Sequence, residues 1–387
     1  MQRQIVLALA AAACTACSAA EPTGPGTVVV AGVATPEYAV IPLGHLGDGS
    51  QGWAVDINNQ NHVVGVAYTT ASTSGPSHAF LWENGVMEDL GTLGGTNSYA
   101  ADINESRQVV GWANTGDGAV HAFFWEAGAM QDLGPVAVTQ WQLRRFTVAS
   151  INERGQVIGN RPGGGAFLWQ GGVTEELPLA SATAINDQGQ VVGWVLAPDT
   201  AGVPMRRAAL WDDGVVTDLG TIGGRWSYAV AISNSGWVAG ESEVDARYPS
   251  YYGHAFRWRD GQIQDLGRTR FNEPYNQAVH VTERGQVLVT VPGSGDASFW
   301  EDGVYQDVTY GLRPGAINHH AAIAGRNPCT GGLVWQDGVL HDLDGANVCG
   351  DASDAIGIND SGVVAGMSGE RVAVIWMRVP DVVASLP

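Results

Sequence analysis

Five carboxylates lie in the longer segments between the apolar stretches of this 387-residue chain, where two of them could act as a general acid and base. A polysaccharide hydrolase or lyase needs two such groups at a fixed separation, with pKa values driven apart by their surroundings. No repeated pair can be identified, and the chain has no Gly-x-Ser-x-Gly, phosphate-loop or His-Glu-x-x-His motif. We therefore assign no catalytic residue and keep a carboxylate-dependent polysaccharide hydrolase or lyase as an alternative function. The five carboxylates are Asp199, Glu241, Glu243, Asp245 and Glu273.

Aromatic residues and arginines in the same long segments suit binding better than catalysis. Exposed rings offer flat apolar faces, and arginines offer forked donors for sugars, carboxylates or peptide backbone. The alternative is that these side chains fold over their own loops as small apolar clusters. The candidate ligand-binding residues are Trp141, Arg144, Arg225, Trp226, Tyr251, Tyr252, Phe271 and Tyr275.

Cysteine and metal chemistry is sparse. Cys329 and Cys349 form an even pair in the bulk of the chain, and together they predict a disulfide. No CxxC or Cys/His cluster supports a zinc site, and no loop carries the alternating oxygen ligands of a dedicated calcium site. We expect no cofactor. Bound calcium is kept as an alternative only because Asp and Asn are abundant. Asp56 and Asp102 do not extend into the other repeats, which argues against a metal ring on an axis.

The elements that must position these residues are repeats of about 40 residues. Each repeat carries an apolar stretch that ends in tryptophan, and such a period is typical of repeat architectures. We expect each tryptophan to fill the space between neighbouring sheets. The eight tryptophans are Trp82, Trp125, Trp169, Trp211, Trp258, Trp300, Trp335 and Trp376.

Four short apolar segments with Gly- and Asn-rich turns make up each repeat, which predicts a four-stranded β-propeller blade. We name the predicted strands a to d: a ends in Ile-Asn, b contains Gln-Val-Val-Gly, c ends in Trp, and d contains Asp-Leu. The last repeat lacks strand d, whereas an orphan strand d, Tyr38 to Gly44, precedes the first repeat. Pairing the two would remove both free edges and close the ring. The sequence therefore predicts an all-β propeller of eight blades, with seven as the alternative because the step from Ile151 to Ile185 is short.

Two polar positions of the repeat have a structural interpretation. His78, His121 and His254 open strand c, and other repeats replace them, so we expect hydrogen bonding at a strand end rather than ligand binding. The asparagines of Ile-Asn are expected to bond the backbone of their own turn.

The joint motif of the repeat resembles the HAF-type repeat of predicted extracellular bacterial proteins. It reads His-Ala-Phe-Leu-Trp at 78–82, Asp-Leu-Gly-Thr-Leu-Gly-Gly at 89–95 and Ile-Asn-x-x-Gly-Gln-Val-Val-Gly at 185–193. The resemblance covers Tyr38 to Met377 and implies secretion and a repeat scaffold, but it brings no catalytic residues.

Composition and the N-terminus bound the location and the partners. The formal net charge is −20 and the chain has no lysine, which argues against nucleic acid and excludes a Schiff-base lysine. Residues 1–17 resemble a bacterial lipoprotein signal with Cys17 as the lipidated residue; ordinary signal cleavage is the alternative. We expect a tether over 18–37, the propeller over 38–378 and a tail over 379–387. Contact with a membrane is expected only through the lipid anchor.

Loop lengths point to one face of the propeller. The a–b and c–d turns are uniformly short, whereas the b–c loops and d–a crossovers on the other face vary. Long variable loops on a rigid scaffold are where binding is usually built. We predict a monomeric protein of the cell envelope or extracellular space that binds a surface glycan or protein through this long-loop face. A purely structural envelope protein is a further alternative.

Overall fold

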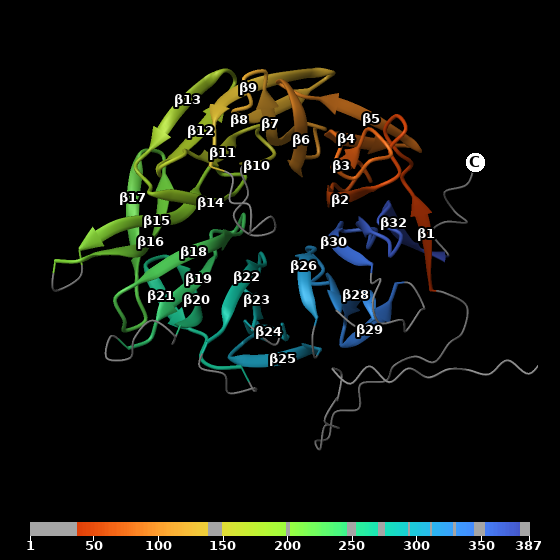
Figure 1. Cartoon of the computed structure of the whole chain (residues 1–387). Helices are drawn as coiled ribbons and strands as arrows, with labels where there is room; N and C mark the ends of the chain where they lie inside the picture. Colours follow the sequence, from red (N-terminus) through yellow and green to blue (C-terminus); the bar gives the residue numbers. More distant parts are fainter. Residues whose placement is uncertain are drawn as a thin grey trace, which may run out of the picture.

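The computed structural model describes residues 37–137, 149–198, 202–245, 253–269, 275–292, 295–309, 312–327, 330–343 and 353–379. The named elements in these ranges are 32 β-strands. They form six four-stranded sheets and one eight-stranded sheet. The larger sheet consists of two four-stranded units joined by one parallel bridge, Ser77 to Asn97. Counted over the described residues, the strands thus make eight sets of four arranged around a centre (Figure 1). The predicted all-β propeller is confirmed.

Strands a surround the centre of the ring, and strands b to d follow outward in each blade (Figure 1). Strands a are β2 (Gly52–Ile57), β6 (Gly94–Ile103), β10 (Ala149–Ile151), β14 (Ser181–Ile185), β18 (Ser227–Ile232), β22 (Gln277–Val281), β26 (Arg313–Ile317) and β30 (Asp354–Ile358). Strands b are β3 (Val63–Tyr68), β7 (Val109–Thr115), β11 (Val157–Asn160), β15 (Val191–Pro198), β19 (Val238–Glu243), β23 (Val287–Thr290), β27 (Ile323–Asn327) and β31 (Val364–Met367).

The outer half of each blade holds the tryptophan strand and the edge strand. Strands c are β4 (Ser77–Glu83), β8 (Val120–Glu126), β12 (Ala166–Gln170), β16 (Pro204–Asp212), β20 (Gly253–Arg259), β24 (Ala297–Glu301), β28 (Gly331–Gln336) and β32 (Ala373–Arg378). Strands d are β5 (Val86–Gly91), β9 (Ala129–Pro135), β13 (Val173–Leu177), β17 (Val215–Gly220), β21 (Gln262–Asp265), β25 (Val304–Thr309), β29 (Val339–Asp342) and β1 (Tyr38–Pro42).

The N-terminal strand closes the ring. β1 runs antiparallel to β32, with Tyr38 opposite Arg378 and Pro42 opposite Val374. The orphan strand d therefore completes the last blade, as the sequence predicts. The short step between Ile151 and Ile185 is accommodated by short strands, because β10 to β13 have only three to five residues each.

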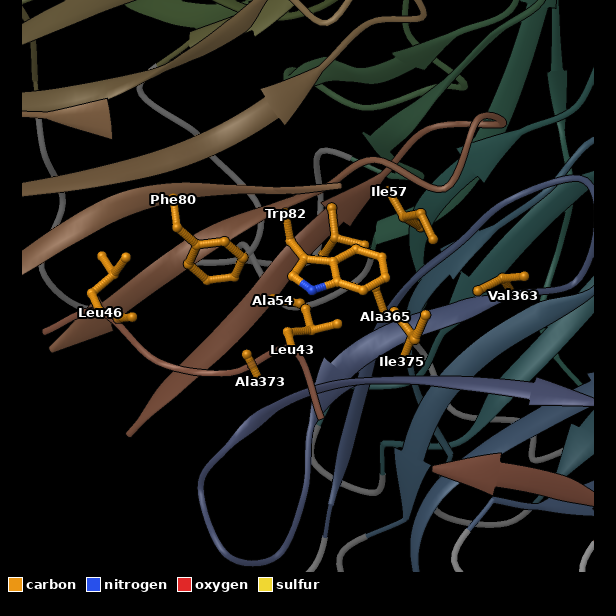
Figure 2. Packing of buried hydrophobic residues seen from close by; sticks show 12 residues of the cluster. Leu43, Leu46, Ala54, Ile57, Phe80, Trp82, Val363, Ala365, Ala373 and Ile375 are labelled. Atoms are coloured by element: carbon orange, nitrogen blue, oxygen red, sulfur yellow. The ribbon is translucent and has the colours of Figure 1, made fainter. Parts of the chain in front are cut away.

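The core lies between neighbouring blades. In Figure 2, Trp82 of the first blade lies beside Ala365 and Ile375 of the last one, and Phe80 lies on the other side of Trp82 in the same cluster. All eight repeat tryptophans are buried, with at most 8% of their surface exposed. Replacing a buried tryptophan by alanine costs about 3–5 kcal/mol, so each one contributes strongly to the contact between two blades. This confirms the structural interpretation of the tryptophan repeat.

Candidate functional site

Strand β18 places two aromatic rings at the long-loop end of the fifth blade. Tyr228 lies on β18, and Trp226 precedes this strand by one residue. Residues two apart on an extended chain point to the same side, so the two rings stack. Their centroids are 6.0 Å apart and their planes differ by 17°. Trp194 of β15 meets Tyr228 edge-on at 6.3 Å, which extends the aromatic surface to the fourth blade.

A buried carboxylate organises the polar side of this surface. Glu241 of β19 is paired in register with Tyr228 and is only 1% exposed. The hydroxyl of Tyr275 donates to Glu241 Oε2 at 2.8 Å, and Gln277 Nε2 donates to the Tyr275 hydroxyl at 2.6 Å. Desolvation, followed by the charge of Glu241, raises the pKa of Tyr275 to about 12. The same two causes raise the pKa of Tyr228, so both hydroxyls stay protonated near neutral pH.

Gly253, the first residue of β20, lies where Trp226 and Tyr275 converge. A Cβ at this position would lie 3.0 Å from Trp226 Cη2 and 3.1 Å from Tyr275 Cε2. The half-buried rings of Trp226 and Tyr275, which come from different blades, therefore both pack against Gly253. We call Trp226, Tyr228, Glu241, Gly253, Tyr275 and Gln277 the aromatic site.

Arg225 borders the aromatic site but already has a carboxylate partner. Its guanidinium lies 3.2 Å from Glu243 Oε1, and its main-chain N–H donates to Glu243 Oε2 at 2.6 Å. Glu243 is fully buried, whereas 40% of the Arg225 side chain is exposed. Removing one partner of such a pair would leave a buried charge, so the pair fixes the segment that carries Trp226.

The structure brings three predicted ligand-binding residues together: Arg225, Trp226 and Tyr275. The contribution of Tyr228, Gln277 and Gly253 was not predicted from the sequence. The sequence does show an aromatic residue, Tyr228, at a position of strand a where another blade has Ser181. From the sequence alone this tyrosine could not be distinguished from a core residue. Outside the described residues lie Trp141, Arg144, Tyr251, Tyr252, Phe271, Asp199, Glu273 and the cysteines Cys17, Cys329 and Cys349.

At the opposite, short-turn end, the centre of the ring contains a cavity of about 310 Å³, and we call the space along the ring axis between the strands a the channel. The cavity is lined by the a–b turns, most of which read Ile-Asn-x, so similar polar groups recur around its wall. Burial, and then the charge of Asp102, raise the pKa of Asp56 well above its ordinary value. His280 is exposed to this cavity, yet desolvation by the surrounding protein and the charge of His319 lower its pKa to about 4. Among the described residues, no group of three or more His, Cys, Asp or Glu side chains could hold a metal ion.

The asparagines of these turns do more than the sequence predicts. Asn104 Oδ1 accepts the N–H groups of Ser106 and Gln108 in its own turn, at 3.1 and 3.0 Å. Its Nδ2 donates to the main-chain oxygen of Asn152 in the next blade, at 3.1 Å. We call this second bond the Asn latch; at 2.9–3.1 Å it is made by Asn58, Asn104, Asn152, Asn186, Asn318 and Asn359.

The histidines of strand c pair with the aspartates of strand d. His78 Nδ1 lies 2.8 Å from Asp89, His121 Nδ1 lies 2.8 Å from Asp132, and His254 Nδ1 lies 2.9 Å from Asp265. Each aspartate also accepts the N–H of the glycine two residues later. The repeated His and Asp positions therefore tie the ends of two strands together, which is the strand-end role that the sequence predicts.

Comparisons with known proteins bear on the fold and leave the chemistry open. The family model "Protein of unknown function (DUF3466)" matches residues 34–132, which span the closing strand and the first two blades. No curated protein matches the chain. In the described part of the chain, no helix is long and apolar enough to cross a membrane.

Several solved structures are similar to this chain, and two of the following three are described as β-propeller domains. The β-propeller domain of the Trilobed protease from Pyrococcus furiosus is 12% identical, with a TM-score of 0.52 over 75% of this chain and 97% of that one. Acylaminoacyl peptidase from Pyrococcus horikoshii is 13% identical, with a TM-score of 0.48 over 75% of this chain and 52% of that one. The WD40 β-propeller domain of Doa1 is 12% identical, with a TM-score of 0.42 over 89% of this chain and 98% of that one. At such identities the likeness concerns the fold alone, and the first match places this chain among proteins with a β-propeller fold.

Proposed function

We propose that this chain is an exported binding protein that recognises a glycan through the aromatic site. The observation that carries the proposal is the convergence of Trp226 and Tyr275 on Gly253, backed by the stacked ring of Tyr228. Half-buried rings that are held next to the first residues of strands present an apolar face at little entropic cost, which favours a ligand with flat apolar faces.

The polar groups around these rings favour a sugar over a protein surface. The Tyr275 hydroxyl and the Gln277 side-chain amide lie beside the rings and carry hydrogen-bond donors and acceptors. They occupy a small area rather than a broad patch. A site that combines apolar faces with a few oriented polar groups is typical of small-ligand recognition. A pyranose has both an apolar C–H face and a rim of hydroxyls, so it matches this combination.

The bonds of Glu241 and Glu243 favour binding without turnover over catalysis. Glu243 is held by Arg225, and Glu241 accepts from Tyr275. Both are buried to 1% or less exposure, so neither is free to protonate a glycosidic oxygen while these bonds persist. A hydrolase or lyase remains the alternative that the product analysis below would detect.

The location belongs to the same proposal. A lipoprotein-type signal with Cys17 as the lipidated residue would hold the ring at the envelope through a tether. A disulfide between Cys329 and Cys349 would strengthen the long-loop face in an oxidising compartment. Mass spectrometry of the exported protein, before and after reduction, would test both modifications.

The test is a binding screen of residues 38–387 against surface glycans and peptidoglycan fragments, with the products checked for cleavage. Trp226→Ala should weaken binding by roughly tenfold to a hundredfold, because it removes a central aromatic contact. Trp237→Ala is the matched control: Trp237 is also half-buried and lies in the same blade, at the start of β19 beside the opposite turn.

Equal loss of affinity in the two variants would contradict the site assignment, since Trp237 packs under Arg257 and Arg259 away from the aromatic site. Binding of no glycan by the wild-type protein would overturn the proposed function. Cleavage that is lost with Glu241→Gln would replace it with the enzymatic alternative.

A further inference from the structure

Equivalent positions of strands a surround the long-loop mouth of the channel. Each occupies the same register, paired with the strand b residue of its blade, so the residues can be compared directly. In the seven blades where the structure describes this position, the mouth pairs are Trp53 with Val66, Tyr99 with Trp112, Ser181 with Trp194, Tyr228 with Glu241, Gln277 with Thr290, Arg313 with Arg326, and Asp354 with Met367.

These mouth positions divide into an aromatic part and a polar part. Trp53 and Tyr99 in the first two blades and Tyr228 in the fifth are aromatic, and Tyr99 stacks on Trp112 with 9° between the ring planes. The same position holds Ser181 in the fourth blade, and in three consecutive blades, the sixth to the eighth, it holds Gln277, Arg313 and Asp354. The polar part therefore begins at Gln277, which is bonded to Tyr275 of the aromatic site.

Arg313 is the cation of this polar part. It is exposed, and within the described part of the chain its guanidinium has no hydrogen bond or ion pair. Its neighbour Arg326 faces the buried carboxylate of Asp354, 3.7 Å away. The Arg313 side chain leans onto the sixth blade, because a Cβ on Gly295 would lie 3.2 Å from Arg313 Cγ and 3.3 Å from its Nε.

We propose that the ligand is a sugar that carries a carboxylate, such as a uronic acid, with Arg313 as the residue that recognises the charge. The inference rests on the proposed function and deepens it. The pyranose face lies on Trp226 and Tyr275, and the carboxylate lies toward the seventh blade, where the planar guanidinium offers paired donors that match its geometry.

The charge of the chain limits this ligand further. A net charge of −20 repels long polyanions, and the repulsion grows with each added carboxylate. Arg313, which has no ion pair within the described part of the chain, compensates one carboxylate. The preferred ligand therefore carries one acidic sugar within an otherwise neutral saccharide.

Calorimetry with ligand pairs that differ by one carboxylate tests the inference. Cellobiouronic acid is compared with cellobiose, and galacturonic acid with galactose, at low and moderate salt. The acidic member of each pair should bind roughly tenfold more tightly, with the difference shrinking as salt rises. Arg313→Gln should remove this preference and leave the affinity for the neutral member unchanged.

The matched control is Arg259→Gln, because the Arg259 side chain is 40% exposed and lies over Trp237, away from the mouth. This variant should keep the preference, and Arg313→Lys should restore part of it. Equal binding of acidic and neutral sugars by the wild-type protein, or a preference that survives in Arg313→Gln, would overturn the inference and leave the proposed function standing. Binding of no sugar, in these pairs or in the wider screen, would overturn both.

Discussion

The two ends of the central channel are built from the same strands but follow opposite rules. At the short-turn end, six blades carry the same asparagine, and each asparagine bonds its own turn and the next blade. At the long-loop end, the equivalent position changes from Trp53 to Tyr228 to Arg313 around the ring. Repetition at one end stabilises the ring, whereas variation at the other leaves room for a specific ligand.

The Asn latch is missing from two neighbouring blades at the turn end. Ser233 and Thr282 replace the asparagine in the fifth and sixth blades, so no Asn latch starts from either of them. These same blades carry the aromatic site at their other end. The two blades without an Asn latch of their own are thus the ones that carry the aromatic site, and Ser235 of the fifth blade bonds Glu283 of the sixth instead.

The largest effect in this comparison is expected at the turn end. Asn104→Ala removes the acceptor of two turn N–H groups and the donor to Asn152, all of them buried or half-buried. We expect a loss of about 2–3 kcal/mol in the free energy of unfolding, because buried groups lose their partners. Urea unfolding measures the loss, and sugar binding by the folded protein should not change.

Asn104→Asp separates the two roles of this side chain. It keeps the acceptor for the turn but loses the donor to the next blade, so it should destabilise the ring while the turn remains intact. Wild-type stability in Asn104→Asp would contradict the importance of the Asn latch. Loss of sugar affinity in either variant would contradict the separation of the two ends.

A smaller effect is expected from His280 in the turn-end cavity. Its folded pKa of about 4 lies below the ordinary value, so the unfolded chain binds more protons between pH 6.5 and 4. The wild-type protein should therefore lose stability as the pH falls through this range, by about 1 kcal/mol after allowance for the exposure of the ring. His280→Gln should remove this part of the loss, as measured by unfolding at pH 7 and pH 4.5.

Other titratable groups lie near His280, and one of them provides the control for that experiment. His319, whose pKa is raised mainly by its bond to Asp360, faces His280, and Glu283 lies beside both. His319→Gln should reduce the His280 step but leave the larger part of it, because desolvation contributes more to the lowered pKa of His280 than the charge of His319 does. An unchanged pH dependence in His280→Gln would contradict the assignment of the step to this side chain.

The fold could be predicted because its signal is repeated. Each tryptophan fills the same kind of space, and the missing last strand and the orphan Tyr38–Pro42 strand match each other. The Asn latch could not be predicted, because the acceptor of Asn104 lies 48 residues away, in a blade whose position depends on the whole ring. The sequence of one turn explains only the bonds inside that turn.

The candidate site could be predicted in part, for a similar reason. Trp226 and Tyr275 stand outside the repeated pattern, so their role as surface aromatics is visible in the sequence. Tyr228 and Glu241 lie inside repeated strands, where they resemble core residues. The role of Gly253 could not be predicted, because it depends on the contacts that Trp226 and Tyr275 make with it in the folded protein.

The most direct test of the binding account changes the distance between two rings without removing either. Gly253→Ala adds one methyl group where Trp226 and Tyr275 converge, so the rings must move apart by a few tenths of an ångström. Gly332→Ala is the matched control, because Ala79, the equivalent residue of the first blade, already takes the same bond from its N–H to a serine hydroxyl. Calorimetry with cellobiouronic acid should show clearly weaker binding for Gly253→Ala, with wild-type affinity for Gly332→Ala and similar melting temperatures for all three. Wild-type affinity in a folded Gly253→Ala protein would contradict the claim that these two rings form the binding site.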